Sequence, residues 1–328
     1  MYKLDWYIIK KFLGTFFFSI TLILLVVIVF DISEKIDDFI EKEAPLRAII
    51  FEYYLNFIPY FGNLFSPLFT FIAVIFFTSK MATNTEIVSI LGSGVSFKRM
   101  LLPFMISATI IGSLSFTLGN FIIPPANEVR LEFENTYIKN PYRNRDKNIH
   151  MQISPGNFVY IESYNSTKNI GYKFSMEQFI QGELKQKLFS NYVEWDSTTS
   201  KWNIHHYFIR TFDGIQETVV EGRQLDTLIN LHPNDFNVRL NTVETMNFFE
   251  LNNYITEERM KGSKNLVFHL IEKHKRMAFP FATIILTLIA VAFASRKVRG
   301  GIGLHLGIGL LISFSYILFM QVSTTFST

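Results

Sequence analysis

The sequence contains no cysteine among its 328 residues. Disulfide bonds, thiolate metal sites and a cysteine nucleophile are therefore excluded, although an oxidising compartment remains compatible with the chain. Charge is also scarce, because only 18% of the residues are charged and the net charge is +3. A charge this small, divided among short clusters, predicts no nucleic-acid partner.

Catalytic signatures are missing as well. The chain has no GxxxxGK[ST] phosphate loop, no HExxH zinc motif and no GxSxG nucleophile elbow. We therefore expect that it neither binds ATP itself nor acts as an enzyme. The histidines at 205, 206, 269 and 274 do not have the spacing of metal ligands, so we predict no metal and no cofactor.

Apolar residues dominate what is present. The chain has 35 Phe, 14 Tyr and 49% hydrophobic residues, a composition typical of proteins in contact with lipid. Five apolar segments are each long enough to cross a hydrocarbon core of about 30 Å. They are residues 12–30, 53–78, 101–123, 279–295 and 304–322. The first is too long for a signal peptide and no cleavage site follows it. We expect Pro124-Pro125 to stop the third.

Charges beside these segments predict their orientation. Lys3, Lys10 and Lys11 precede the first segment, whereas six acidic and only three basic residues occupy 31–47. The stretch 80–99 is basic again, with a single acidic residue. Because cytoplasmic loops are enriched in Lys and Arg, we expect a cytoplasmic N-terminus and an extracytoplasmic segment 124–276.

The segment 124–276 changes to a period of two, which is typical of β-strands. Turn sequences such as Pro155-Gly156 and Asp213-Gly214 separate its runs. We predict seven strands, at 149–153, 157–163, 172–180, 184–195, 202–212, 217–228 and 235–242. Strands of this number and spacing favour an antiparallel sandwich or jelly roll. A helix is predicted at 247–258.

Four short motifs carry a family resemblance. They are Leu4-Asp5-x-Tyr7-Ile8, Thr85-Glu86-Ile87-Val88 followed by Gly92-Ser93-Gly94, Asn157-Phe158-Val159-Tyr160-Ile161-Glu162, and Lys275-Arg276 with Pro280. In this order, with an insert between spans three and four, they resemble the LptF/LptG permease family, subunits of the lipopolysaccharide-exporting ABC transporter. The resemblance covers essentially the whole chain, and the first and third motifs are closer to LptG.

The resemblance implies a multi-pass permease of the bacterial inner membrane. Residues 1–123 would form three spans with a cytoplasmic coupling helix, 124–276 a periplasmic jelly roll, and 277–328 two further spans. A lateral opening between spans one and five of paired permeases would admit lipopolysaccharide. The family has six spans, so we expect a sixth helix beyond Thr328, with its loss as the alternative.

The resemblance also implies partners. They are an ATPase dimer similar to LptB, a sister permease similar to LptF, a single-span periplasmic partner similar to LptC, and a periplasmic bridge similar to LptA.

The segment 84–94 predicts a short helix, with Thr83 or Asn84 as its N-cap and Glu86 in its first turn. In the resembling family this segment is the coupling helix that receives the motion of the ATPase. The resemblance thus assigns ATPase coupling to four residues: Glu86, Ile87, Gly92 and Gly94. An ordinary cytoplasmic loop with a capping carboxylate is the alternative.

Basic residues at the outer end of span four oppose the orientation trend. Lys275 and Arg276 lie there, and Arg and Lys pair strongly with phosphate in a partly dry interface. With Lys35 and Arg130 they could surround a lipid phosphate. The resemblance favours Arg130 over Lys35, because the region after span three supplies phosphate contacts in the family. Snorkelling cations that anchor the helix end are the alternative.

In the run 157–162, Phe158 and Tyr160 alternate with Val159 and Ile161, so the two pairs face opposite sides of the sheet. The inner face of a sandwich is ordinarily core. The resembling family leaves its jelly roll open as a groove for acyl chains, and Phe158 and Tyr160 are candidates to line it. The sequence leaves open which pair does so.

We therefore predict a permease that extracts lipopolysaccharide and passes it to a periplasmic bridge. The alternative is a membrane-anchored periplasmic scaffold or receptor whose jelly roll binds protein or glycan. A transporter subunit should copurify with a nucleotide-binding protein and a sister permease, whereas a scaffold should not.

Overall fold

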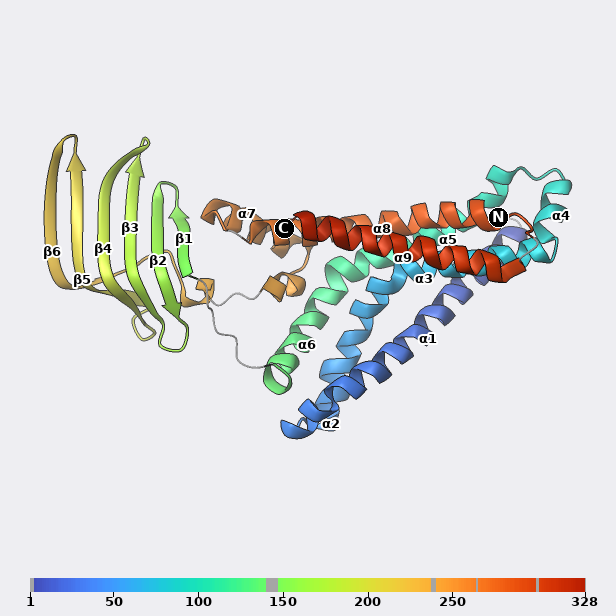
Figure 1. The fold of residues 1–328 in the computed structure, drawn as a ribbon, viewed down its shortest axis with the longest axis horizontal. Helices are drawn as coiled ribbons and strands as arrows, with labels where there is room; N and C mark the ends of the chain where they lie inside the picture. The colour runs from blue at the N-terminus through green and yellow to red at the C-terminus, as the bar shows by residue number, and fades with distance from the viewer. Residues whose placement is uncertain (1–2, 140–146, 237–239, 264, 299–300, 328) are drawn as a thin grey trace. The chain divides into compact units, whose positions relative to one another are not determined.

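A computed structural model describes residues 3–139, 147–236, 240–263, 265–298 and 301–327 (Figure 1). The chain forms two compact units. The membrane unit comprises Met1–Lys139, Glu244–Phe248 and Ile271–Thr328. The sheet unit comprises Asn140–Val243 and Phe249–Leu270.

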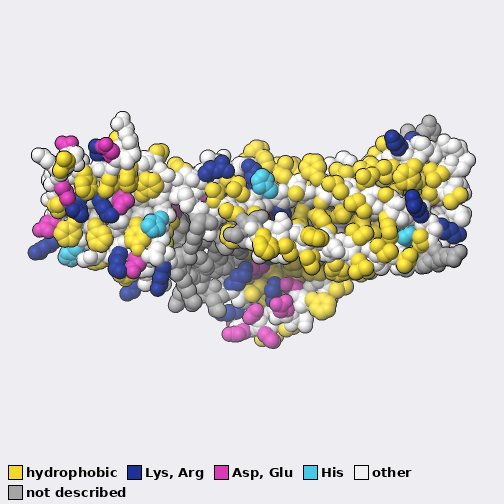
Figure 2. Space-filling view, turned by 45° about the horizontal axis from the view of Figure 1, so that its top comes forward, with side chains coloured by type: hydrophobic (Ala, Val, Ile, Leu, Met, Phe, Trp, Pro, Cys, Tyr) yellow, Lys and Arg dark blue, Asp and Glu magenta, His cyan; other side chains and the backbone are white. Residues whose placement is uncertain are grey.

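Long helices joined by short helical segments build the membrane unit. They are α1 (Lys3–Glu41), α2 (Leu46–Ala48), η1 (Ile49–Tyr54), α3 (Leu55–Thr83), α4 (Glu86–Gly92), α5 (Phe97–Thr117), η2 (Leu118–Ile122), α6 (Ile123–Tyr137), α8 (Leu266–Ala294) and α9 (Gly301–Ser327). Among the described residues, five helical segments are long and apolar enough to cross a membrane, which confirms the five predicted spans. Hydrophobic side chains cover much of the visible helical surface (Figure 2).

The third span does not stop at Pro124-Pro125, and this prediction is wrong. Helix α5 passes through the π-helical turn η2 directly into α6. The two prolines are the second and third residues of α6 and directly follow η2. Proline is tolerated inside a membrane helix where a local π-helical adjustment accommodates the missing amide.

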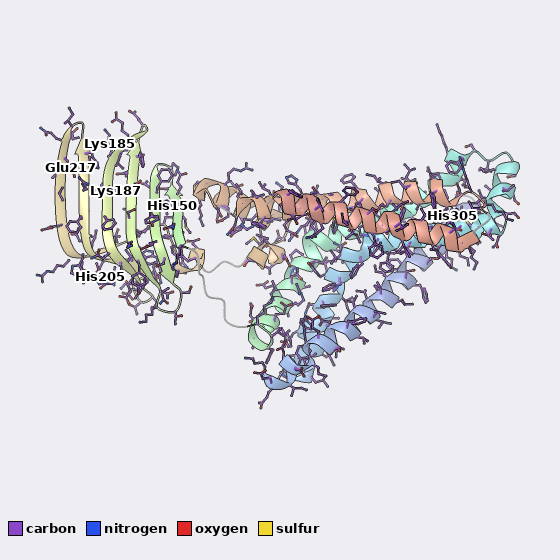
Figure 3. The ribbon with its side chains drawn as sticks, in the orientation of Figure 1. His150, Lys185, Lys187, His205, Glu217 and His305 are labelled. Carbon is purple, nitrogen blue, oxygen red and sulfur yellow. The ribbon has the colours of Figure 1, made fainter. Side chains whose placement is uncertain are left out.

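The membrane unit has a core built from several spans. Phe12 of α1, Phe71 of α3, Phe104 of α5 and Ala290 of α8 are all buried in one cluster. Helix α9 packs on α3, where buried His305 (labelled in Figure 3) accepts or donates a hydrogen bond of 2.7 Å with Ser79. Close helix packing with buried hydrogen bonds is how membrane helices associate.

The insert is an antiparallel sheet, so its predicted all-β character is confirmed. Its six strands are β1 (Lys147–Ser154), β2 (Asn157–Asn165), β3 (Ile170–Ile180), β4 (Glu183–Asp196), β5 (Lys201–Asp213) and β6 (Gln216–Thr227). They pair in chain order as a single sheet, and not as the two packed sheets of a sandwich. The reason is that each connection is a short hairpin, which makes consecutive strands neighbours.

The ladder of this sheet is interrupted along a line that crosses all its strands. Each pair of neighbouring strands has the same register before and after this line. That register places one residue of each strand in a row across the sheet: Asn148, Glu162, Lys173, Asn191, His206 and Arg223. We call this line the crease. In alternate strands its residues have left-handed φ, with 55° at Asn148, 50° at Lys173 and 51° at His206.

The alternation of core-facing and outward-facing side chains along a strand shifts by one residue at the crease. Ile204 and Tyr207 of β5 pack against the same core, as do Ile161 and Tyr164 of β2. A regular strand would place residues three apart on opposite faces. Because such irregularities bend strands, a single sheet can curve around its own core. Figure 1 shows the strands bowed along their length.

The chain after β6 covers the core of the sheet unit. Trp202 Nε1 donates to the Leu231 carbonyl at 2.8 Å, and Asn230 Nδ2 donates to the Ile153 carbonyl at 3.0 Å. The 3-10 helices η3 (Pro233–Phe236) and η4 (Leu240–Thr245) then lead to α7 (Phe248–Lys261). Helix α7 confirms the helix predicted at 247–258.

A seventh strand was predicted at 235–242, and its described residues do not form one. Residues 237–239 lie outside the described part, and the remainder lies in η3 and η4. Asp235 at this point accepts from the backbone amide of His232 at 2.8 Å and pairs with Lys261 at 2.9 Å. Side-chain bonds of Asp to nearby backbone compete with strand pairing.

The crease predicts a difference between two lysine-to-glycine substitutions. Lys173 pairs with Glu162 at 2.7 Å and Lys187 with Glu177 at 2.6 Å, but only Lys173 has a left-handed φ. Lys187→Gly should lower the free energy of unfolding by about 1 kcal/mol. Lys173→Gly should be neutral or stabilising, because glycine relieves the backbone strain.

Unfolding of the full chain in detergent can be followed by the fluorescence of Trp195 and Trp202, with Trp6→Phe as the background. A larger loss for Lys173→Gly than for Lys187→Gly would contradict the strain at the crease.

Candidate functional site

A short helix joins α3 to α5, as predicted for 84–94. It is α4, which has Glu86 in its first turn. The predicted caps are wrong, because Thr83 Oγ1 donates to the Ser79 carbonyl and Asn84 Nδ2 donates to Glu86 Oε1 at 3.2 Å. Thr85 precedes the helix with φ 63° and makes no side-chain cap bond. That left-handed residue turns the chain sharply out of α3.

Helix α4 has a buried face and an exposed apolar face. Ile87 is 2% exposed and belongs to the core of the membrane unit. Val88 is 63% exposed, and Leu91, three residues on, is exposed as well. Residues three apart share one side of a helix. Ile87 therefore anchors α4, while Val88 and Leu91, which the sequence analysis missed, are available to a partner. Gly92 ends α4 and Gly94 follows with φ 87°, a conformation that favours glycine.

The beginning of α1 holds the α4 segment. Tyr7 OH donates to Glu86 Oε2 at 3.3 Å. Buried Asp5 accepts two hydrogen bonds of 2.7 Å from the Arg99 guanidinium at the start of α5. A bidentate Arg–carboxylate pair fixes orientation as well as distance. Two of the motifs in the sequence thus meet in space, which only the fold reveals.

A cavity of about 50 Å³ lies among α3, η2, α6 and α8 in the membrane unit. Its lining residues come from three spans: Tyr60, Asn63, Leu64, Gly119, Ile123, Asn127, Glu272, Lys275, Arg276 and Phe279. Two of the predicted cations, Lys275 and Arg276, are among them. Charged side chains between membrane helices are costly to bury and mark functional sites by default.

Arg130 adjoins this cavity and is 8% exposed. Its guanidinium pairs with Glu134 at 2.6 Å, donates to Asn127 Oδ1 at 3.2 Å, and lies 3.9 Å from Glu244. It also lies over the ring of Tyr60, 5.1 Å from the ring centre. Arg130 thus lies beside the cavity that Lys275 and Arg276 line. Its charge is already balanced by carboxylates that were not predicted from the sequence.

Arg276 and Lys275 differ in their partners. Arg276, 8% exposed, pairs with Glu272 at 2.9 Å and donates to the Met246 carbonyl at 2.7 Å. Lys275 lies over the Phe279 ring at 5.6 Å and forms no ion pair with any residue that the structure describes. Lys275 is therefore the cation at the cavity with the most freedom to bind an added anion.

Carboxylates crowd this site as well. Burial, and next the neighbouring Glu272, raise the pKa of the Glu244 carboxyl above its usual range. The nearby cations lower it again without cancelling these effects. Desolvation and a neighbouring like charge both make the ionised form of a carboxyl group less stable relative to its neutral form.

Lys35 is not among the residues that line the cavity. It pairs with Asp31 at 2.6 Å and lies in close contact with the Tyr53 hydroxyl. Tyr54 OH donates to the other oxygen of Asp31 at 3.0 Å. Three of the four predicted cations thus gather at one place, and the fourth stabilises the packing of α1 against η1.

The sheet unit has a pocket of about 280 Å³ on the face opposite its core. The lining residues are His150, Met151, Phe158, Val159, Tyr160, Ser175, Glu177 and Lys187. His150 and Lys187 are labelled in Figure 3. Phe158 is 40% exposed, whereas Val159 and Ile161 are buried in the core. Of the two alternating pairs, Phe158 and Tyr160 are therefore the pair with space beside it.

No group of three or more His, Cys, Asp and Glu side chains in the described ranges is placed to hold a metal ion.

A comparison with protein families identifies a match over nearly the whole chain. The model of the family described as lipopolysaccharide export system permease LptF/LptG matches residues 6–328. The match includes α4, the cavity residues and the whole sheet. No curated protein matches the chain.

The pairing at the cavity predicts unequal stability effects for two neighbouring residues. Arg276→Gln should lower the free energy of unfolding by about 2 to 3 kcal/mol, because it leaves Glu272 and the Met246 carbonyl without their partner. Lys275→Gln should change it by less than about 0.5 kcal/mol. Thermal unfolding in detergent measures both, and equal losses would refute the difference in pairing.

Proposed function

The chain belongs to the LptF/LptG family of lipopolysaccharide export permeases, and we propose that it is the permease subunit of an ABC transporter that extracts lipopolysaccharide from the inner membrane. The permeases of this family are transport subunits and not catalytic enzymes. The observation that carries the proposal is Lys275, a cation without a carboxylate partner among the described residues, at a cavity between spans. Phosphate groups of a lipid supply the anion that such a site needs.

The proposed orientation places α4 in the cytoplasm and the sheet unit in the periplasm. The basic flank before α1 and the basic stretch 80–99 support this orientation, because Lys and Arg concentrate in cytoplasmic loops. ATP would then be hydrolysed by a separate subunit dimer similar to LptB.

Helix α4 is the proposed docking site for that ATPase. Its exposed Val88 and Leu91 would enter an apolar groove of the partner, a common mode of helix recognition. Glu86 would add a charged contact at the rim. Its bonds from Tyr7 and Asn84 hold the carboxylate in place before the partner arrives. Gly92 and Gly94 would let the chain leave α4 close to the partner surface.

The cavity among α3, η2, α6 and α8 is the proposed phosphate site. Its volume is far too small for a lipid, so only a phosphate group would reach it while the acyl chains remain outside. Lys275 would bind the phosphate first, with Arg276 and Arg130 behind it. Lys35 would contribute from its own cluster with Asp31 and Tyr53.

The sheet unit is the proposed receiver of the acyl chains. The pocket beside Phe158 and Tyr160 supplies apolar surface for a chain, and Lys187 with Glu177 closes its rim. A periplasmic bridge similar to LptA, a single-span partner similar to LptC and a sister permease similar to LptF would complete the path. The motifs before α1 and in β2 support the LptG role for this chain. Lipid would enter through a lateral opening beside α1 and α9 of the paired permeases.

Charge reversal in α4 tests ATPase docking. Glu86→Lys and Val88→Asp should each abolish copurification of the ATPase and lipopolysaccharide export, since they place an unpaired charge in the interface. Glu34→Lys, an exposed reversal on α1, is the matched control and should leave both unchanged. If no nucleotide-binding protein copurifies even with the parent chain, the protein is a membrane-anchored scaffold and the transport proposal fails.

Neutralising Lys275 tests the phosphate site. Lys275→Gln should reduce photo-crosslinking of lipopolysaccharide in cells about tenfold, as expected for the loss of one charge-assisted phosphate contact. Lys273→Gln, two residues away and not lining the cavity, should have little effect. Equal crosslinking in the two variants would show that the cavity is not the phosphate site.

A further inference from the structure

A five-residue segment of the membrane unit interrupts the sheet unit in the sequence. Glu244–Phe248 belongs to the membrane unit, although Val243 before it and Phe249 after it belong to the sheet unit. We call this segment the strap. It carries the chain from η4 to the start of α7, so any movement of the strap must move both neighbouring segments.

Helices α6 and α8 hold the strap through polar contacts. Asn127 Nδ2 of α6 donates to the Glu244 carbonyl at 3.3 Å, and the Glu244 carboxylate lies 3.9 Å from Arg130. From α8, Arg276 Nη1 donates to the Met246 carbonyl at 2.7 Å. The arginines at the proposed phosphate site are thus the same arginines that fasten the strap.

The cations at this site already have carboxylates beside them, so an added anion must compete for them. The three cations Arg130, Lys275 and Arg276 face the three carboxylates Glu134, Glu244 and Glu272. Lys139, which also pairs with Glu134, is a fourth cation, so four positive and three negative charges give a net charge of +1. A phosphate monoester carries about −1.5 to −2 charge and would make the group anionic, so in a partly dry site the least tightly held carboxylate must give way or become protonated.

Glu244 is that carboxylate. Its distance to Arg130 is 3.9 Å, whereas Glu134 lies 2.6 Å from Arg130 and Glu272 lies 2.9 Å from Arg276. Glu134 also has a second cation, Lys139. Since both other carboxylates stand on the same helix as their arginine, at a spacing of four residues, they remain near it when the strap moves.

We propose that the strap is a latch that the phosphate of the cargo releases. This inference rests on the proposed phosphate site. A phosphate bound at Lys275 competes with Glu244 for Arg130 and with the Met246 carbonyl for Arg276, so occupied permease loses the two arginine contacts to the strap and keeps only the weaker Asn127 bond described above. Release then loosens η4 and α7, which continue into the sheet unit. Binding of cargo in the membrane unit would in this way change the segments that lead into the sheet unit.

A single cysteine tests this latch, because the chain has none of its own. Thr245→Cys places a thiol on the half-buried strap, and Thr218→Cys on exposed β6 is the matched control. The full-length protein, in nanodiscs of phosphatidylethanolamine with or without lipopolysaccharide, is labelled with a water-soluble maleimide. Retained lipopolysaccharide is measured in the same samples.

Lipopolysaccharide should increase the labelling rate at position 245 about tenfold and leave position 218 unchanged. Glu244→Gln should raise the rate at 245 without lipid, because the strap then lacks its charge. Inorganic phosphate in place of the lipid separates the two sources of the anion, and acceleration by phosphate alone would overturn lipid as the trigger.

Three other results would overturn the proposal in distinguishable ways. If lipopolysaccharide is retained and the rate at 245 does not change, the latch is wrong while the proposed function stands. If no lipopolysaccharide is retained, the phosphate site fails, and lipid release of the strap fails with it. An unchanged rate at 245 in Arg276→Gln without lipid would show that this arginine does not fasten the strap.

Discussion

Ion pairing in a water-poor environment is the constraint on which this structure depends. Charges between membrane helices are tolerated only when they are paired or hydrogen-bonded. Arg130 and Arg276 meet this requirement through Glu134, Glu244 and Glu272. The same pairs draw α6, α8 and the strap together, so one electrostatic demand both shapes the fold and gathers cations at the proposed phosphate site.

The sheet unit obeys a different constraint. A single antiparallel sheet must bury one face, and here no second sheet covers it among the described residues. The crease solves this by bending every strand at the same level, so that Ile161 and Tyr164 reach one core. The opposite face keeps exposed aromatic side chains such as Phe158, and that face carries the pocket.

Local patterns in the sequence predicted much of the fold but could not predict where local rules yield to packing. Apolar length and alternation indicated the spans and six of the strands. Pro124-Pro125 was wrongly expected to end a helix, because the π-turn η2 before it cannot be recognised from composition. Thr83 and Asn84 were wrongly expected to cap α4, since their bonds depend on how α3 ends.

Residues close together along the chain are enough to predict the membrane spans, the all-β insert, the short helix containing Glu86 and the presence of cations near the ends of spans. Which of these cations meet depends on the packing of the helices. Arg130, Lys275 and Glu244 are far apart in sequence, and Lys35 has neighbours of its own. Their grouping follows from how α3, α6 and α8 pack, because pairing energy depends on distance in space and on the exclusion of water.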